Sequence, residues 1–195
     1  AQTVKHLGDA LHAALWASPA VPLGATPMFW WWQLVDEENF YPTYAGVSRF
    51  MEGEDRRGTN LAANTPQLRL DDAPAPGLAV QCLKGKDRAF GWIYRTDFSA
   101  ADPNAAPSKT GVTLRLDAMA PGKFVVEFWD TLAGKAVAQL SVRSKDGVLA
   151  VAVPAFARDI AFKARGQKSE VRGQQSEGSR LRPQATASQG SQRLA

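Results

Sequence analysis

Apolar residues recur at helical spacing near the start of the chain. They stand at Val4, Leu7, Leu11 and Leu15. This spacing predicts a helix over residues 3–18, which Thr3 can cap and Pro19 ends. A second helix is predicted for residues 39–51, where apolar positions repeat at the same spacing and Gly53 supplies the stop.

Between these two helices lies an apolar stretch, Thr26–Trp32, that ends in three consecutive tryptophans. Side chains alternate between the faces of a strand, so Trp30 and Trp32 should point one way and Trp31 the other. A strand that is apolar on both faces is typical of a parallel sheet, whose carboxyl ends hold ligands. We therefore expect Trp31 to be a core residue. Trp30 and Trp32 should be partly exposed, where an indole can face the apolar side of a sugar ring.

Polar side chains follow the tryptophans. Asp36, Glu37 and Glu38 could each act as a general acid or hydrogen-bond a sugar. The alternative is that these acids only stabilise the start of the next helix through its dipole. The candidate substrate-binding residues are Trp32, Trp30, Gln33, Asp36 and Asn39.

From residue 67 to residue 164 the pattern changes to short apolar runs separated by turn residues. The runs are 78–84, 88–95, 112–116, 123–129, 136–142, 148–153 and 159–164. Many short strands with tight turns and no helix between them predict an antiparallel β-sandwich. Residues 59–66 form a polar linker before it. We expect Trp92 and Trp129 in the sandwich core or at a domain interface, and Cys82 in the core.

Residues 1–58 contain a single predicted strand, and one strand cannot bury two apolar faces alone. We therefore expect this part to be the incomplete end of a larger structure. His12 can reach Asp9 one helical turn earlier, which favours a structural role. His6 and His12 are six positions apart and lie on different helix faces, so no metal site is predicted. No cofactor site is predicted either.

Charge is concentrated at the end of the chain. The net charge of the 195 residues is +4, and residues 165–195 carry six Lys/Arg and two Glu, so this segment accounts for all of it. A body without net charge gives no reason to expect nucleic-acid binding. The segment is rich in Ser, Gln, Arg and Gly, which predicts a disordered basic tail. No apolar run reaches the roughly 18 residues of a membrane helix, so no membrane partner is expected.

Several motifs together resemble a known enzyme family. In the first part they are His12–Ser18, Gly24–Trp32, Asn39, Tyr41-x-x-Tyr44, Arg49-Phe50 and Gly53. In the second part they are Phe90–Ile93, Pro121–Thr131, Gly147–Leu149 and Val153-Pro154. The first set resembles the last helix–strand–helix of the (β/α)8 barrel in family 5-like (clan A) glycoside hydrolases. The second resembles the small β-domain that follows such barrels.

The resemblance implies a role in polysaccharide degradation. Enzymes of this type use two glutamates on barrel strands that would lie upstream of Ala1, so no catalytic residue is expected in this chain. The chain alone should be inactive, whereas its parent protein should be an extracellular or periplasmic glycoside hydrolase. Trp32 matches the aromatic residue of strand eight that lines a sugar subsite. Related sequences carry an acid just after the tryptophans, where this chain has Gln33.

The expected fold class is therefore α+β in several parts. Residues 1–58 form a barrel end, 59–66 a linker, 67–164 an antiparallel β-sandwich and 165–195 a disordered tail. The expected partners are a polysaccharide or oligosaccharide and the upstream barrel. The alternatives are a non-catalytic carbohydrate-binding module and a purely structural β-sandwich.

Overall fold

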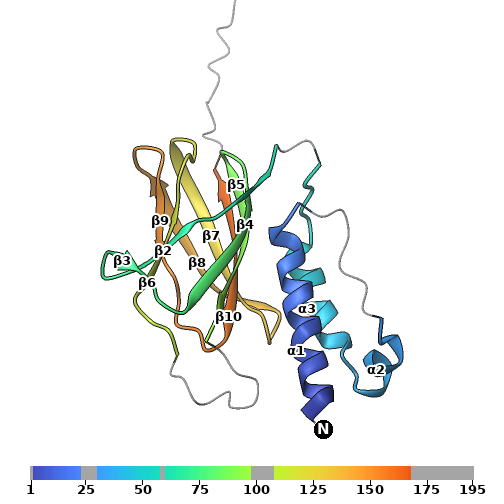
Figure 1. Ribbon diagram of the computed structural model, residues 1–195. Coiled ribbons are helices and arrows are strands. Elements are labelled where there is room, and N and C mark those ends of the chain that lie inside the picture. Colours follow the sequence, from blue (N-terminus) through green and yellow to red (C-terminus); the bar gives the residue numbers. More distant parts are fainter. Residues whose placement is uncertain (1, 23–29, 58–59, 98–107, 168–195) are drawn as a thin grey trace, which may run out of the picture.

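The computed structural model of the chain describes residues 2–22, 30–57, 60–97 and 108–167. Its helices come first in the sequence and its strands afterwards (Figure 1). The helical elements are α1 (Gln2–Ala17), the 3-10 turn η1 (Ser18–Ala20), α2 (Trp32–Glu37) and α3 (Tyr41–Met51). The predicted helices thus correspond to α1 and α3, whereas α2 was not predicted. In the described ranges, none of the helices is long and apolar enough to cross a membrane.

The strands form two antiparallel sheets. The six-stranded sheet contains, in spatial order, β1 (Ala62–Asn64), β4 (Leu78–Lys84), β5 (Arg88–Arg95), β10 (Asp159–Gly166), β7 (Gly122–Asp130) and β8 (Lys135–Ser144). The four-stranded sheet contains β3 (Ala73–Pro74), β2 (Gln67–Leu70), β6 (Val112–Leu116) and β9 (Leu149–Ala152). The two sheets pack face to face over a shared apolar core, which confirms the predicted β-sandwich.

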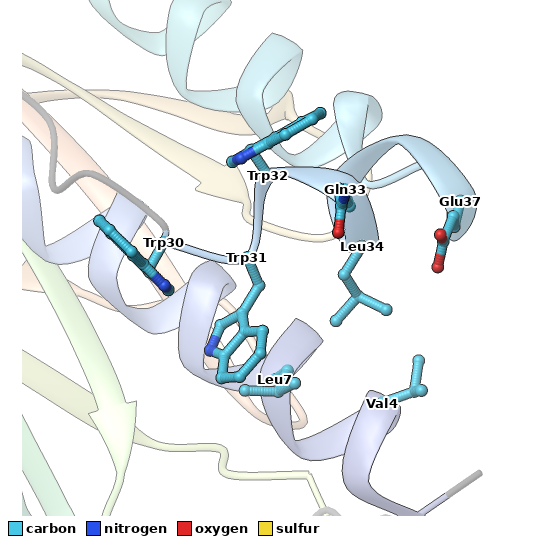
Figure 2. A pocket seen from close by; sticks show the side chains of 8 residues that line it. All are labelled: Val4, Leu7, Trp30, Trp31, Trp32, Gln33, Leu34 and Glu37. Carbon is cyan, nitrogen blue, oxygen red and sulfur yellow. The ribbon is translucent and has the colours of Figure 1, made fainter.

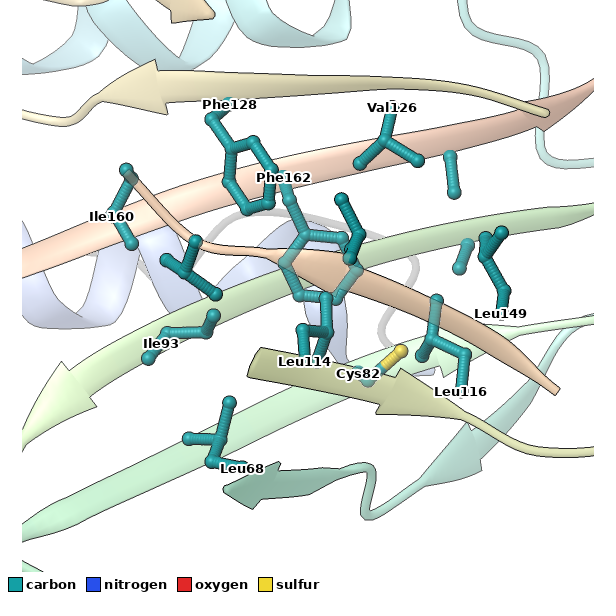
Figure 3. Close-up of a cluster of buried hydrophobic side chains, with 14 of the residues drawn as sticks. Leu68, Cys82, Ile93, Leu114, Leu116, Val126, Phe128, Leu149, Ile160 and Phe162 are labelled. Atoms are coloured by element: carbon teal, nitrogen blue, oxygen red, sulfur yellow. The ribbon is translucent and has the colours of Figure 1, made fainter. Parts of the chain in front are cut away.

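The sandwich core lies between the two sheets (Figure 3). Strand β10 shows how the sequence places it, because alternate residues Ile160, Phe162 and Ala164 point into this core. Cys82 of β4 lies in the same core and is 1% exposed, as predicted. Burial raises the pKa of its thiol to about 12. The thiol is therefore protonated and unreactive at neutral pH.

The outer face of the six-stranded sheet is covered by the helices. A second apolar core forms there from Leu11, Leu15, Trp16, Val47, Phe50, Phe90, Trp92 and Ala161. Strands β5 and β10 are therefore buried on both faces. Trp92 belongs to this helix–sheet interface and Trp129 packs against it, as expected for domain-interface residues. In Figure 1, α1 and α3 lie against the sheet, and α2 lies farther from the sandwich.

The predicted strand that ends at Trp32 is wrong in its described part. Trp30 and Trp31 are outside any strand and Trp32 begins α2, while residues 26–29 lie outside the described residues. The physical reason is that all strand pairs of the two described sheets are antiparallel, so the described residues offer no parallel sheet in which this segment could pair. The backbone pairs locally instead, with the Val35 N–H donating to the Trp31 carbonyl over 3.3 Å.

The segment expected as a polar linker contains a strand. Residues 62–64 form β1, which pairs with β4 at the edge of the six-stranded sheet. Strands β2 and β3 were also not predicted. The division of the chain into a barrel end and a sandwich stays a prediction. Of the predicted tail, residues 165 and 166 belong to β10, and residues 168–195 lie outside the described residues.

Gly91 gives the first testable prediction. It pairs with Phe162 across the sheet, and a Cβ at this position would lie 2.2 Å from the Phe162 ring. Gly91→Ala should therefore lower the free energy of unfolding by about 1–3 kcal/mol through overpacking. Urea denaturation measures the loss. If the clash is the cause, Gly91→Ala/Phe162→Leu should lose less than the sum of the two single variants; an additive loss would contradict it.

Candidate functional site

The three tryptophans form an exposed surface beside the helices. Trp30 is 81% exposed, Trp31 56% and Trp32 70%, and we call them together the tryptophan surface. The expectation that Trp31 is a core residue is therefore wrong. A strand between two sheet neighbours would have buried it, but at the start of a short helix its ring only lies over α1, near Leu7 (Figure 2). Three neighbouring exposed indoles form an apolar patch of a kind that is uncommon on protein surfaces.

The tryptophan surface lines a hollow of about 430 Å³ that we call the indole hollow (Figure 2). Val4 and Leu7 of α1 form one wall. The other wall comes from residues 30–34 and Glu37. The apolar stripe of α1 thus serves two purposes, because Leu11 and Leu15 are buried in the helix–sheet core while Val4 and Leu7 remain half-buried beside the tryptophans.

A second hollow of about 490 Å³ shares Trp32 with the indole hollow, and we call it the tyrosine hollow. Its lining residues are Trp32, Val35, Asp36, Tyr41 and Tyr44. The Tyr41 hydroxyl donates a hydrogen bond to Oδ1 of Asp36 over 3.1 Å. This hydrogen bond, together with the charge of Asp36, raises the pKa of Tyr41. The hydroxyl therefore stays protonated at neutral pH, and the pair presents a fixed polar edge.

Local packing holds α2 in place. Val35 is buried in the core shared by the helices. Phe40, just after α2, packs against α1 at Gly8, where a Cβ would lie 3.1 Å from the Phe40 ring. Gly8 thus allows the close approach that positions the turn between α2 and α3. This turn contains Asn39, whose φ of +50° is left-handed and whose N–H donates to the Asp36 carbonyl over 3.3 Å.

The structure brings most of the candidate residues together. Trp30, Trp32 and Gln33 line the indole hollow, and Trp32 and Asp36 line the tyrosine hollow. Asn39 lines neither hollow and belongs to the turn. Their role in binding a substrate stays a prediction. The sequence analysis did not place Val4, Leu7 or Tyr41 at the site. Helical spacing marked Val4 and Leu7 as part of an apolar stripe, and Tyr41 was named only as part of the Tyr41-x-x-Tyr44 motif.

The ionisable side chains are divided between the two hollows. Asp36 and Glu37 line different hollows, so they do not face each other across one bond as the carboxyl pair of a glycoside hydrolase must. Among the described residues, no group of three or more His, Cys, Asp or Glu is placed to hold a metal ion. What the hollows offer is aromatic rings, an amide and two carboxylates at their edges.

Buried polar contacts fix the helices that carry this site to the sandwich. His12 of α1 contacts Asp159 of β10, with 2.9 Å between Nε2 and Oδ2. Asp9, the expected partner of His12, instead binds Arg158. The difference arises because β10 passes beside α1 and offers a buried carboxylate. Just after α3, Glu54 binds Lys163, Arg88 and Arg165.

No family model matches the chain, and no curated protein matches it. Solved structures that are similar in part include the following two. A protein described as a glycoside hydrolase shares 10% identity with a TM-score of 0.40, covering 74% of this chain and 29% of that one. A GH30 endoxylanase from Clostridium papyrosolvens C71 shares 12% identity with a TM-score of 0.36, covering 64% of this chain and 28% of that one. The chain thus spans less than a third of each of these two glycoside hydrolases.

Proposed function

We propose that this chain is a carbohydrate-binding part of a glycoside hydrolase and that the tryptophan surface binds sugar rings. The observation that carries the proposal is the group of three neighbouring, mostly exposed indoles at the border of two hollows. An indole is large and flat, and its apolar face suits the C–H face of a sugar ring while its N–H can reach a hydroxyl. Exposed apolar surface of this kind is typical of a ligand-binding groove.

In this proposal the sandwich supports the site. The tryptophan surface rests on α1 and α2, and α1 is packed and hydrogen-bonded against the six-stranded sheet. A site is held more rigidly by packed elements than by free loops, so the sheet keeps α1 and its hollow in one position. The catalytic groups would come from another part of the enzyme, and this chain alone would bind glycans without cleaving them.

The test replaces Trp32, which lines both hollows. Trp32→Ala should weaken binding of neutral oligosaccharides to the full chain about tenfold or more, because a central aromatic anchor carries much of the binding energy. Titration calorimetry with cello-, xylo- and manno-oligosaccharides measures the change. Circular dichroism should show the same fold, since the Trp32 side chain is 70% exposed.

Leu132→Ala is the matched control. Leu132 is 69% exposed and lies in the turn after β7, where it lines a separate hollow of the sandwich. Its replacement should leave glycan binding unchanged. If Leu132→Ala abolished binding and Trp32→Ala did not, the sandwich would be the binding module. Binding of no glycan by the wild-type chain would overturn the proposal.

A further inference from the structure

We infer that the indole hollow and the tyrosine hollow together accept at least two neighbouring rings of an uncharged glycan, with Trp32 between them. This inference rests on the proposed function and adds the class of glycan to it. Its first support is that Trp32 lines both hollows, so a chain that lies across this indole reaches both. Trp32 can do so because 70% of its side chain is exposed.

The size of the hollows supports two rings. Their volumes of about 430 and 490 Å³ each fall within the range of about 300–1,000 Å³ typical of small-molecule sites. Each hollow also has two aromatic residues of its own besides Trp32, namely Trp30 and Trp31 in the indole hollow and Tyr41 and Tyr44 in the tyrosine hollow. Tyr41 is 54% exposed and is therefore accessible to a ligand. A sugar ring in either hollow could therefore contact aromatic side chains that belong to that hollow.

The charge of the lining residues favours an uncharged glycan. The ionisable acids at the two hollows are Glu37 and Asp36, and neither lining set contains a lysine, arginine or histidine. A uronate or sulfate group brought into either hollow would meet a carboxylate without a cation to offset it. Like charges a few ångströms apart repel, and the repulsion weakens as salt rises because the screening length falls to about 3 Å at 1 M.

The polar groups at the edges suit hydroxyl groups. The carboxylates of Asp36 and Glu37 accept hydrogen bonds, and the Gln33 amide both donates and accepts them. Asp36 already accepts a hydrogen bond from the Tyr41 hydroxyl, which fixes its orientation and leaves further acceptor sites on its two oxygens. Sugar hydroxyls can donate to these carboxylates, whereas an anionic group cannot.

The experiment compares ligands by length and charge on the full chain. Titration calorimetry uses cello-, xylo- and manno-oligosaccharides of one to four rings, and oligogalacturonides of the same lengths as the anionic series. For the neutral series that binds best, the affinity should rise about tenfold or more from one ring to two. At low salt, oligogalacturonides should bind about tenfold more weakly than neutral oligosaccharides of the same length. This difference in affinity should shrink at 1 M salt.

Variants test the two hollows, and the two parts of the inference, one at a time. Trp30→Ala and Tyr41→Ala should each remove most of the gain between one ring and two. The double variant Asp36→Asn/Glu37→Gln should reduce the difference in affinity between neutral and anionic oligosaccharides. Neutral binding that does not depend on length would overturn the two-ring arrangement, and oligogalacturonide binding as tight as neutral binding would overturn the charge argument. In both cases the proposed function would stand; it fails if no glycan binds or if Trp32→Ala leaves glycan binding unchanged.

Discussion

Replacing Asp159 with alanine should lower the free energy of unfolding by about 3–5 kcal/mol, because it removes a buried carboxylate that several groups share. Asp159 is 6% exposed. Its Oδ2 lies 2.9 Å from Nε2 of His12 and accepts a hydrogen bond from the Trp92 indole over 3.2 Å. Its Oδ1 accepts a hydrogen bond from the Thr131 hydroxyl. Each buried polar group that loses its hydrogen-bond partner costs about 1–3 kcal/mol. The variant leaves three such groups, on His12, Trp92 and Thr131, and together they account for the expected loss of stability.

Urea denaturation of the wild type and the variant measures this loss. Asp117→Ala is the control, because Asp117 is exposed at the end of β6 and its replacement should change stability by less than about 0.5 kcal/mol. A double-mutant cycle with His12→Ala isolates the contact between α1 and β10. Coupling of about 1 kcal/mol or more is expected for residues in direct contact. Additive losses would show that His12 and Asp159 do not stabilise each other.

The same contacts set the acid stability of the protein. Burial alone would raise the pKa of Asp159, but the hydrogen bond and charge of His12, the Thr131 hydroxyl and the Arg158 charge outweigh it and hold the pKa below its ordinary value. Such a carboxyl adds stability above its unfolded pKa of about 3.9 and loses it as the pH falls through the folded value. The wild type should therefore lose stability below about pH 4, and Asp159→Ala should lose less over that range. An equally steep fall in both proteins would contradict this account.

Replacing Glu54 with alanine should lower the free energy of unfolding by about 3 kcal/mol, because it leaves Lys163 buried with fewer partners. The Glu54 side chain is fully buried and the Lys163 side chain is 5% exposed. The Glu54 carboxylate lies 2.6 Å from Arg88 and 3.3 Å from Lys163. The loss should stay at the low end of the range for buried pairs, since Glu127 remains 3.5 Å from the Lys163 ammonium.

The neighbouring residue Asp55 provides a control for Glu54. Asp55 pairs with Arg57 on the surface, so Asp55→Asn should leave stability close to that of the wild type. The variant Glu54→Leu/Lys163→Met removes both charges and should recover most of the loss, because apolar side chains can replace a buried ion pair at little cost. If Glu54→Ala unfolds at the wild-type urea concentration, Glu54 does not hold α3 to the sheet.

Sequence patterns predicted the strands well where the controlling interactions are local. Strands β4, β5 and β6 begin and end at the predicted residues, because alternation of apolar side chains and glycine turns act over a few positions. The segment from Trp30 to Glu37 was predicted less well. Whether an apolar segment is a strand or a helix depends on which neighbours it finds, and those neighbours are not encoded within the segment itself.

The sequence by itself determined the two helices α1 and α3, the antiparallel sandwich and the concentration of aromatic residues that marks the candidate site. Only the tertiary structure decided that Trp32 begins a helix between two hollows and that the outer face of β10 is buried. Asp159 and Lys163 alternate along that face, and charged residues on a strand normally indicate solvent. His12, which contacts Asp159, lies 147 residues away in sequence, and the Phe50 carbonyl, which accepts a hydrogen bond from Lys163, lies 113 residues away. Only folding brings these groups close enough to offset the cost of burying the two charges.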